Sequence, residues 1–144
     1  HTINKDLQDL NNAASPFLVI PNPAATAENM SVELNEKKIY VVLPQEQHGI
    51  YRSMGHSRSE QKAMHAMIFV PALMFVFEEL RKRLENTGDF ADFSGYQWIR
   101  ALEKVAEKRF NKTLEELLLA KEPLELSQMF LKNPMNDAFE MYRR

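Results

Sequence analysis

Two short stretches near the front of the chain alternate between apolar and polar residues, which is the pattern of a half-buried β-strand. Val32 and Leu34 alternate with polar neighbours, and residues 39–43 are β-branched or aromatic apart from a final leucine. Between them, the polar residues 35–38 supply a turn. The pattern therefore predicts a β-hairpin over residues 30–43.

The residues before the hairpin, 1–29, form a lead of mixed character. Apolar positions within residues 7–14 indicate one or two turns of amphipathic helix. Residues 17–20 form an apolar run that is followed by Pro21, as a short strand would be. Because a lone hairpin is marginally stable in water, it must lie against helices or gain this run as a third strand.

The longest apolar segment predicts a single long helix. Ser57 with Glu60 forms a capping box at its start, and the polar residues 86–88, which end in glycine, stop it. Its apolar part, 63–77, is about 15 residues long, whereas a membrane span needs roughly 20. We therefore expect a central core helix and no membrane span, with a kink at Pro71, which lacks an amide donor.

Four further segments show a helix-starting residue followed by apolar positions at helical spacing. Ser94 with Gln97, and Thr113 with Glu116, form capping pairs, and a proline opens each of the last two segments. Such units joined by short loops are typical of a compact helical bundle. The predicted helices cover residues 94–106, 113–119, 123–131 and 133–142.

These elements together predict an α+β fold that is predominantly helical. A short N-terminal β-hairpin, open to a third strand, would pack on a bundle of about four to five helices around the Pro71 helix. We expect one globular domain over residues 30–144, with the hairpin at 30–43 and the bundle at 57–144. The chain has 144 residues, 44% of them hydrophobic, which suffices for a core without crosslinks.

The cysteine content excludes some classes of function, and the charge disfavours another. The absence of cysteine excludes disulfides, thiol nucleophiles and Cys-ligated metal sites. Together with a start that does not resemble a signal peptide, it predicts a soluble, cytoplasmic protein. The net charge is −2, and the basic residues 81–83 directly follow acidic ones, as on a solvated helix face. This balance disfavours nucleic acid as a partner.

Motifs that carry chemistry are missing from the sequence. Its four glycines are scattered, so that no phosphate-binding loop is formed. The histidines His48, His56 and His65 show no pair at the spacing that places two imidazoles on one helical face. We therefore predict no catalytic residue, no cofactor and no metal site, and we favour a protein that is not an enzyme.

One polar cluster lies between the predicted hairpin and the long helix. It consists of His48, Tyr51, Arg52, His56 and Arg58, which we expect on a loop. Two arginines near a helix N-terminus can hold an anion or the carboxylate of a partner. The alternative is a solvated connection with ordinary surface residues.

Three groups of residues carry a resemblance that spans residues 30 to 142. They are Phe-Val-Pro-Ala-Leu at 69–73, Gly-Tyr-Gln-Trp at 95–98, and a tail with Leu-Ser-Gln at 126–128, Leu131, Asn133-Pro134 and Ala138. With the strand pair before them, they resemble uncharacterised proteins encoded by prophages and other mobile elements of bacteria. The resemblance implies no particular activity and no functional residues.

The leading hypothesis is a non-enzymatic protein that works through protein–protein contacts, as an accessory or structural part of a larger phage or mobile-element assembly. Its partner would be another protein or a second copy of the chain. Methionines in the helical segments suit adaptable interfaces as well as cores. One alternative is a nucleic-acid-associated factor that uses Arg52, Arg58 and the basic residues 81–83. The other is a small-molecule enzyme with a pocket near His48, Tyr51 and His56.

Overall fold

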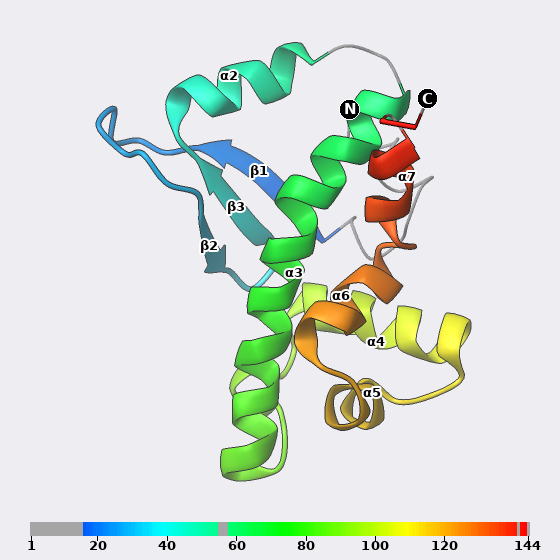
Figure 1. Cartoon of the computed structure of the whole chain (residues 1–144). Helices are drawn as coiled ribbons and strands as arrows, with labels where there is room; N and C mark the ends of the chain where they lie inside the picture. Colours follow the sequence, from blue (N-terminus) through cyan, green and yellow to red (C-terminus); the bar gives the residue numbers. More distant parts are fainter. Residues whose placement is uncertain (1–15, 55–57, 141, 144) are drawn as a thin grey trace.

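The structure, a computed structural model, describes residues 16–54, 58–140 and 142–143. Within these residues the fold is α+β and predominantly helical, as predicted (Figure 1). Its strands are β1 (Phe17–Pro21), β2 (Ser31–Leu34) and β3 (Ile39–Leu43). Its helices are α2 (Gln45–Ser53), α3 (Arg58–Thr87), α4 (Gln97–Phe110), α5 (Leu114–Ala120), α6 (Pro123–Phe130) and α7 (Pro134–Glu140), with a short 3-10 helix η2 (Ala91–Phe93).

The described strands form one sheet in the order β1-β3-β2. The predicted hairpin is confirmed, because β2 and β3 pair antiparallel and the amide of Asn35 donates to the carbonyl oxygen of Lys38 at 3.0 Å across the turn. The apolar run before the hairpin becomes the third strand and pairs parallel with β3, with Phe17 opposite Ile39. Successive residues of β3, Val41, Val42 and Leu43, are all buried although they point to alternate faces of the sheet, which explains why β3 is an unbroken apolar run.

Helix α3 is the spine of the molecule (Figure 1). Its N-terminal half lies over the sheet, where the rings of Phe69 and Phe17 are 5.2 Å apart. Its C-terminal half packs among the later helices, where the rings of Phe77 and Phe130 are 5.0 Å apart. Phe69, Phe77 and Leu73 between them are fully buried. The prediction that this segment forms the core is therefore confirmed.

Pro71 lies inside α3, and the helix continues on both sides of it. The expected kink at this residue stays a prediction. Of the described residues, one helical stretch, Glu60–Thr87, is long and apolar enough to cross a membrane by length and composition. Core helices of soluble proteins meet the same criteria, and 44% of its most apolar segment is buried inside the molecule. More than half of that segment is thus not buried.

The predicted start of the helix over residues 94–106, which is α4 in the structure, is wrong. We expected Ser94 to cap it, but α4 begins at Gln97, and no side chain caps its start. Gly95 has a φ of 86°, which turns the chain away from helical geometry directly after Ser94. The aromatic ring of Phe93 then contacts Trp98, with ring centroids 5.1 Å apart. The turn and these ring contacts set the start of α4, rather than a local cap.

The other predicted helix starts agree with the structure where it describes them. The Thr113 hydroxyl accepts from the amide of Glu116 at 3.1 Å, and the Glu116 carboxylate accepts from the amide of Thr113 at 2.9 Å. This capping box opens α5, and a proline is the first residue of both α6 and α7. The predicted cap at Ser57 and the amphipathic turns within 7–14 lie outside the described residues.

Candidate functional site

The polar cluster singled out in the sequence does not lie on a loop. His48, Tyr51 and Arg52 all belong to α2, a nine-residue helix. The sequence pattern missed this helix, because its only large apolar residues are Ile50 and Tyr51. Glu46 in the first turn and Arg52 in the last turn both suit the helix dipole.

Only part of the cluster can be assigned to a surface. Arg52 is exposed, while His48 is half-buried. Arg58 is the first residue of α3, but its side chain and all of His56 lie outside the described part of the chain. Tyr51 is buried among apolar groups, and this burial raises the pKa of its hydroxyl to about 12. At neutral pH the Tyr51 hydroxyl therefore stays protonated, and the side chain packs in the core.

An apolar groove lies beside Tyr51, between α2 and the N-terminal half of α3. Its volume is about 430 Å³. Its walls are formed by two helices and the strand region: Met64, Met67 and Ile68 of α3; Gln47, Ile50 and Tyr51 of α2; and Met30, just before β2, with Leu43 at the end of β3. With Gln47 as its one polar lining residue, the groove suits the burial of an apolar group from outside.

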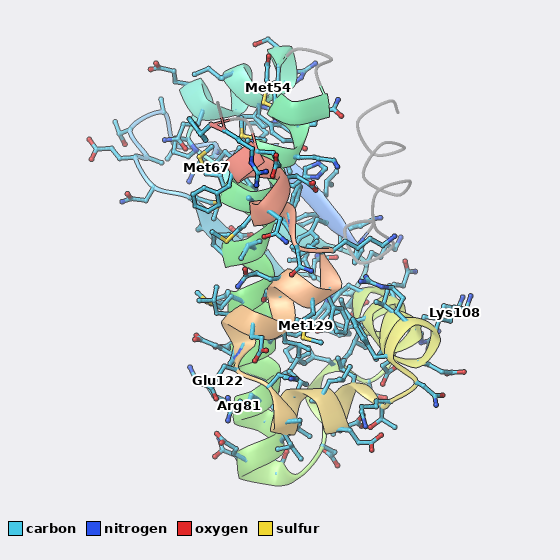
Figure 2. All side chains as sticks on the ribbon, turned by 45° about the vertical axis from the view of Figure 1, so that its right-hand side comes forward. Met54, Met67, Arg81, Lys108, Glu122 and Met129 are labelled. Atoms are coloured by element: carbon cyan, nitrogen blue, oxygen red, sulfur yellow. The ribbon has the colours of Figure 1, made fainter. Side chains whose placement is uncertain are left out.

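The groove opens onto a line of apolar side chains along α3. We call this line the α3 stripe; it consists of Met64, Met67, Pro71, Met74 and Phe75. Met67 is 64% exposed and Phe75 is 38% exposed, while the other three are half-buried. The spacing of three to four residues places all five on one face of the helix. Figure 1 shows α3 running along the front of the molecule, and Figure 2 labels Met67.

Sequence reasoning did not find the α3 stripe. Apart from His65, residues 63–77 are apolar around the whole circumference of the helix, so that the pattern gives little sign of which face is covered. The signal that could have found it is the charged residues that continue the same helical face beyond the stripe. Glu60 lies before the stripe, Glu78 and Lys82 lie after it, and all three are exposed. Charged residues that continue one face of an apolar helix indicate that this face reaches the surface.

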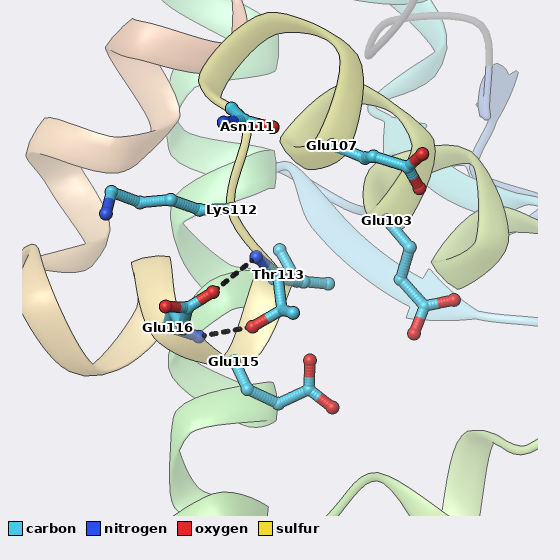
Figure 3. Close-up of a pocket in the computed structure, with 8 residues that line it drawn as sticks. Glu103, Glu107, Asn111, Lys112, Thr113, Glu115 and Glu116 are labelled. Carbon is cyan, nitrogen blue, oxygen red and sulfur yellow. Dashed lines mark hydrogen bonds between the residues drawn. The ribbon is translucent and has the colours of Figure 1, made fainter.

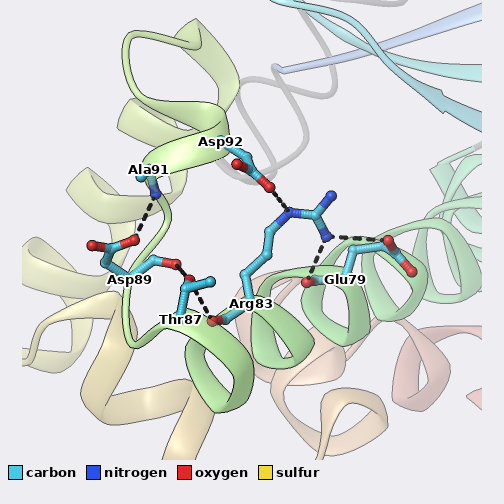
Figure 4. A network of polar contacts seen from close by, with 6 residues as sticks. All are labelled: Glu79, Arg83, Thr87, Asp89, Ala91 and Asp92. Atoms are coloured by element: carbon cyan, nitrogen blue, oxygen red, sulfur yellow. Dashed lines mark hydrogen bonds and ion pairs between the residues drawn. The ribbon is translucent and has the colours of Figure 1, made fainter.

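The basic residues at 81–83 are engaged with acids of the same chain. Arg83 Nη1 lies 3.3 Å from Glu79 Oε1, and Arg83 Nε lies 3.3 Å from Asp92 Oδ2, as an ion pair without hydrogen-bond geometry (Figure 4). The guanidinium also stacks 4.4 Å from the centre of the Phe93 ring. Arg81 Nη1 lies 3.1 Å from Glu122 Oε2, and both residues are labelled in Figure 2. Two of the three cations thus tie α3 to η2 and to the start of α6.

A second, open recess of about 510 Å³ lies where α4 meets α5 (Figure 3). Its walls are mostly polar and include Glu103, Glu107 and Glu115. Partial burial raises the pKa of Glu103, with the nearby Glu115 raising it further and Arg100 opposing them. Among the described residues, no group of three or more acidic or histidine side chains is arranged to hold a metal ion. Among the described residues, the recess is therefore an acidic surface hollow whose side chains are not arranged as metal ligands.

No family model matches the chain, and no curated protein or solved structure shows significant similarity to it. The candidate site must therefore be judged on its geometry. Of the surfaces described, the groove and the adjoining α3 stripe form the one that combines a mostly apolar hollow with exposed apolar side chains beside it. Such a surface binds by burying apolar groups and not by supplying reactive ones.

Proposed function

We propose that this protein is a non-enzymatic interaction protein, and that the α3 stripe with its groove receives the apolar face of a helix from a protein partner. The observation that carries the proposal is the α3 stripe, in which Met67 and Phe75 are exposed and the other three residues half-buried, on a helix whose opposite face is the core. The stripe is about 16 Å long at the rise of an α-helix, which is three turns of a partner helix laid alongside.

The chemistry of the surface supports a helix as the occupant. Residues at three-to-four spacing present a straight ridge along the helix axis, into which the ridges of a second helix can pack. Methionine side chains are unbranched and flexible, so that Met64, Met67 and Met74 can adapt to a partner's shape. The groove beside the stripe could take one large apolar anchor. An accessory role in a phage or mobile-element assembly is the setting we propose for such contacts.

The rival functions find less support among the described residues. A nucleic-acid site would need unpaired cations, whereas Arg81 and Arg83 are paired with acids. Of the residues named for an enzyme site, Tyr51 is buried, and this burial moves its pKa further from neutral pH. We therefore rank protein contact through α3 first.

Site-specific photocrosslinking in the native cells tests the proposal. A photoreactive amino acid would replace Met67 in one variant and Leu119 in the other, since the two side chains are 64% and 63% exposed and lie on different helices. We expect the probe at position 67 to give a discrete protein adduct that the probe at 119 does not give. Mass spectrometry should then map the crosslinked peptide to an amphipathic helix of the partner.

Either of two results would overturn the proposal. Equal or absent crosslinking at both positions would mean that the α3 stripe has no partner. Crosslinking of position 67 to lipid or nucleic acid, and not to protein, would assign the surface to another class of ligand.

A further inference from the structure

We infer that Met67 is a reversible oxidation site, and that conversion of its thioether to the sulfoxide by a peroxide switches off partner binding at the α3 stripe. The inference rests on the proposed function, because it adds a means of regulation to the same surface. It follows from the methionines that this surface gathers and from the exposure of one of them.

The groove and the α3 stripe hold half of the methionines of the chain. Met30, Met64 and Met67 line the groove, Met74 continues the stripe, and the chain has eight methionines in all. Because the chain has no cysteine, thioethers are its only sulfur groups. Peroxides oxidise thioether sulfur, so that a large part of the sulfur oxidation open to this chain falls on the proposed binding surface.

Met67 is the member of this group that a peroxide reaches most easily. It is 64% exposed, whereas Met30, Met64 and Met74 are half-buried. Met135 of α7, the other exposed methionine among the described residues, is 36% exposed. Oxidation of a thioether follows its accessibility. Met67 is therefore open to a peroxide in the free chain and, at the same time, part of the wall that a partner would cover.

The reaction is a two-electron oxidation by hydrogen peroxide. The Met67 sulfur attacks one peroxide oxygen, the O–O bond breaks, an S–O bond forms, and the second oxygen leaves as water. The thioether is thereby oxidised to the sulfoxide and the peroxide is reduced. Methionine sulfoxide reductases reverse the change, since two thiols reduce the sulfoxide, release its oxygen as water and become a disulfide.

The sulfoxide is a poor neighbour for an apolar partner. Its oxygen is a strong hydrogen-bond acceptor, and the groove that Met67 helps to line is mainly apolar. A partner helix laid over Met67 would take this oxygen out of water, which costs free energy unless a donor replaces the lost hydrogen bonds. A bound partner also covers the sulfur from peroxide. Oxidation and partner binding therefore oppose each other at this residue.

Peroxide mapping of the purified full chain tests the site itself. The chain is treated with increasing amounts of hydrogen peroxide, and peptide mass spectrometry gives the oxidised fraction of each methionine. We expect Met67 to be oxidised ahead of Met64 in the groove and of Met135 on α7. The unfolding midpoint from circular dichroism should stay unchanged at the dose that oxidises Met67, because this side chain lies outside the core. If Met67 reacts no faster than the half-buried Met64, the inference is wrong.

Capture of the partner tests the consequence of oxidation. A photoreactive phenylalanine analogue replaces Phe75, which is 38% exposed on the same stripe. The purified chain is oxidised, freed of peroxide and only then added to an extract of the native cells, so that the partner itself is not oxidised. The oxidised chain should give about tenfold less protein adduct than the untreated chain. Methionine sulfoxide reductases for both sulfoxide epimers should restore the adduct.

Three variants of the probe-bearing chain assign the effect to one residue. Met67→Leu keeps an apolar side chain of similar size but has no sulfur, so that its capture should be the same before and after peroxide, whatever its starting level. Met135→Leu removes the exposed methionine of α7 and should keep the tenfold loss. Met67→Gln places a polar group at the same position and should lower capture without any peroxide.

The outcomes separate this inference from the proposed function. If the oxidised chain captures a protein as well as the untreated chain does, the α3 stripe is an interaction surface and Met67 is not its switch. An equal loss of capture in Met67→Leu would place the sensitive group elsewhere and would also overturn the inference. If even the untreated chain captures no protein, the proposed function fails, and this inference fails with it.

Discussion

In the recess where α4 meets α5, two glutamates have pKa values shifted in opposite directions. The pKa of Glu116 is lowered, chiefly by the hydrogen bond from the backbone amide of Thr113, which favours its charged form. The pKa of Glu103 is raised, chiefly by burial and then by the neighbouring Glu115, both of which disfavour its charged form. Two residues of the same type thus contribute opposite pH dependence to stability.

The raised pKa of Glu103 predicts a stabilising substitution. Between the unfolded pKa near 4.5 and the higher folded value, the folded chain binds more protons, so that stability falls as the pH rises through this window. Glu103→Gln should therefore stabilise the protein at neutral pH. Because the side chain is largely exposed, we expect a gain below about 1 kcal/mol.

Thermal unfolding between about pH 4 and pH 8 would measure this gain. The difference from the natural chain should vanish at the acid end, where Glu103 is protonated in both states. Glu107→Gln, at the edge of the same recess, is the matched control and separates a local effect from a change in net charge. A gain for Glu103→Gln that persists unchanged at acid pH would contradict the assignment.

At the scale of elements, α4 is joined to the hairpin by one buried side chain. Trp98 is fully buried, and its indole Nε1 donates to the carbonyl oxygen of Asn35 at 2.7 Å. The amide of Gln97 donates to the carbonyl oxygen of Glu36 at 2.8 Å. The first turn of α4 is therefore anchored by the hairpin turn, and the two elements stabilise each other.

Replacing Trp98 with phenylalanine should loosen this junction. The substitution keeps an aromatic ring in the core but leaves the Asn35 carbonyl without its donor, which costs about 1–3 kcal/mol. Chemical denaturation would measure the loss, and hydrogen exchange should show faster exchange of the amides in the 35–38 turn. A stable variant with unchanged exchange in this turn would mean that packing alone holds the junction.

At the scale of the whole molecule, α3 belongs to two halves of the core. Phe69 packs on the sheet and Phe77 packs on α6, and an uninterrupted helix connects them. A local loss of packing at either residue is thus transmitted to the other half. We expect the chain to unfold in one cooperative transition.

Phe69→Ala tests this expectation. The cavity it leaves should cost about 3–5 kcal/mol. The midpoint from the fluorescence of Trp98, the only tryptophan, should fall together with the midpoint from far-ultraviolet circular dichroism. Phe139→Ala, at a ring that is 69% exposed, is the control and should change stability by no more than about 0.5 kcal/mol. Separate midpoints for the two probes would show that the halves unfold independently.

Local patterns in the sequence determined most of the elements. The alternation at Val32 and Leu34 gave the hairpin, and the Thr113–Glu116 pair and Pro123 gave the starts of α5 and α6. These signals are reliable because a cap, a turn or a strand alternation is satisfied by atoms within a few residues of one another.

Only the tertiary structure decided the rest. Tyr51 of α2 is buried against other elements, and the start of α4, set locally by the turn at Gly95, is held by a hydrogen bond from Trp98 to Asn35 across more than sixty residues of chain. The parallel pairing of β1 with β3 likewise joins distant segments. Most importantly, residues 63–77 are apolar apart from His65, and only the placement of the other elements decides that Met67 and Phe75 stay exposed. Sequence determines how much apolar surface a helix carries, while packing determines which part of it is left for a partner.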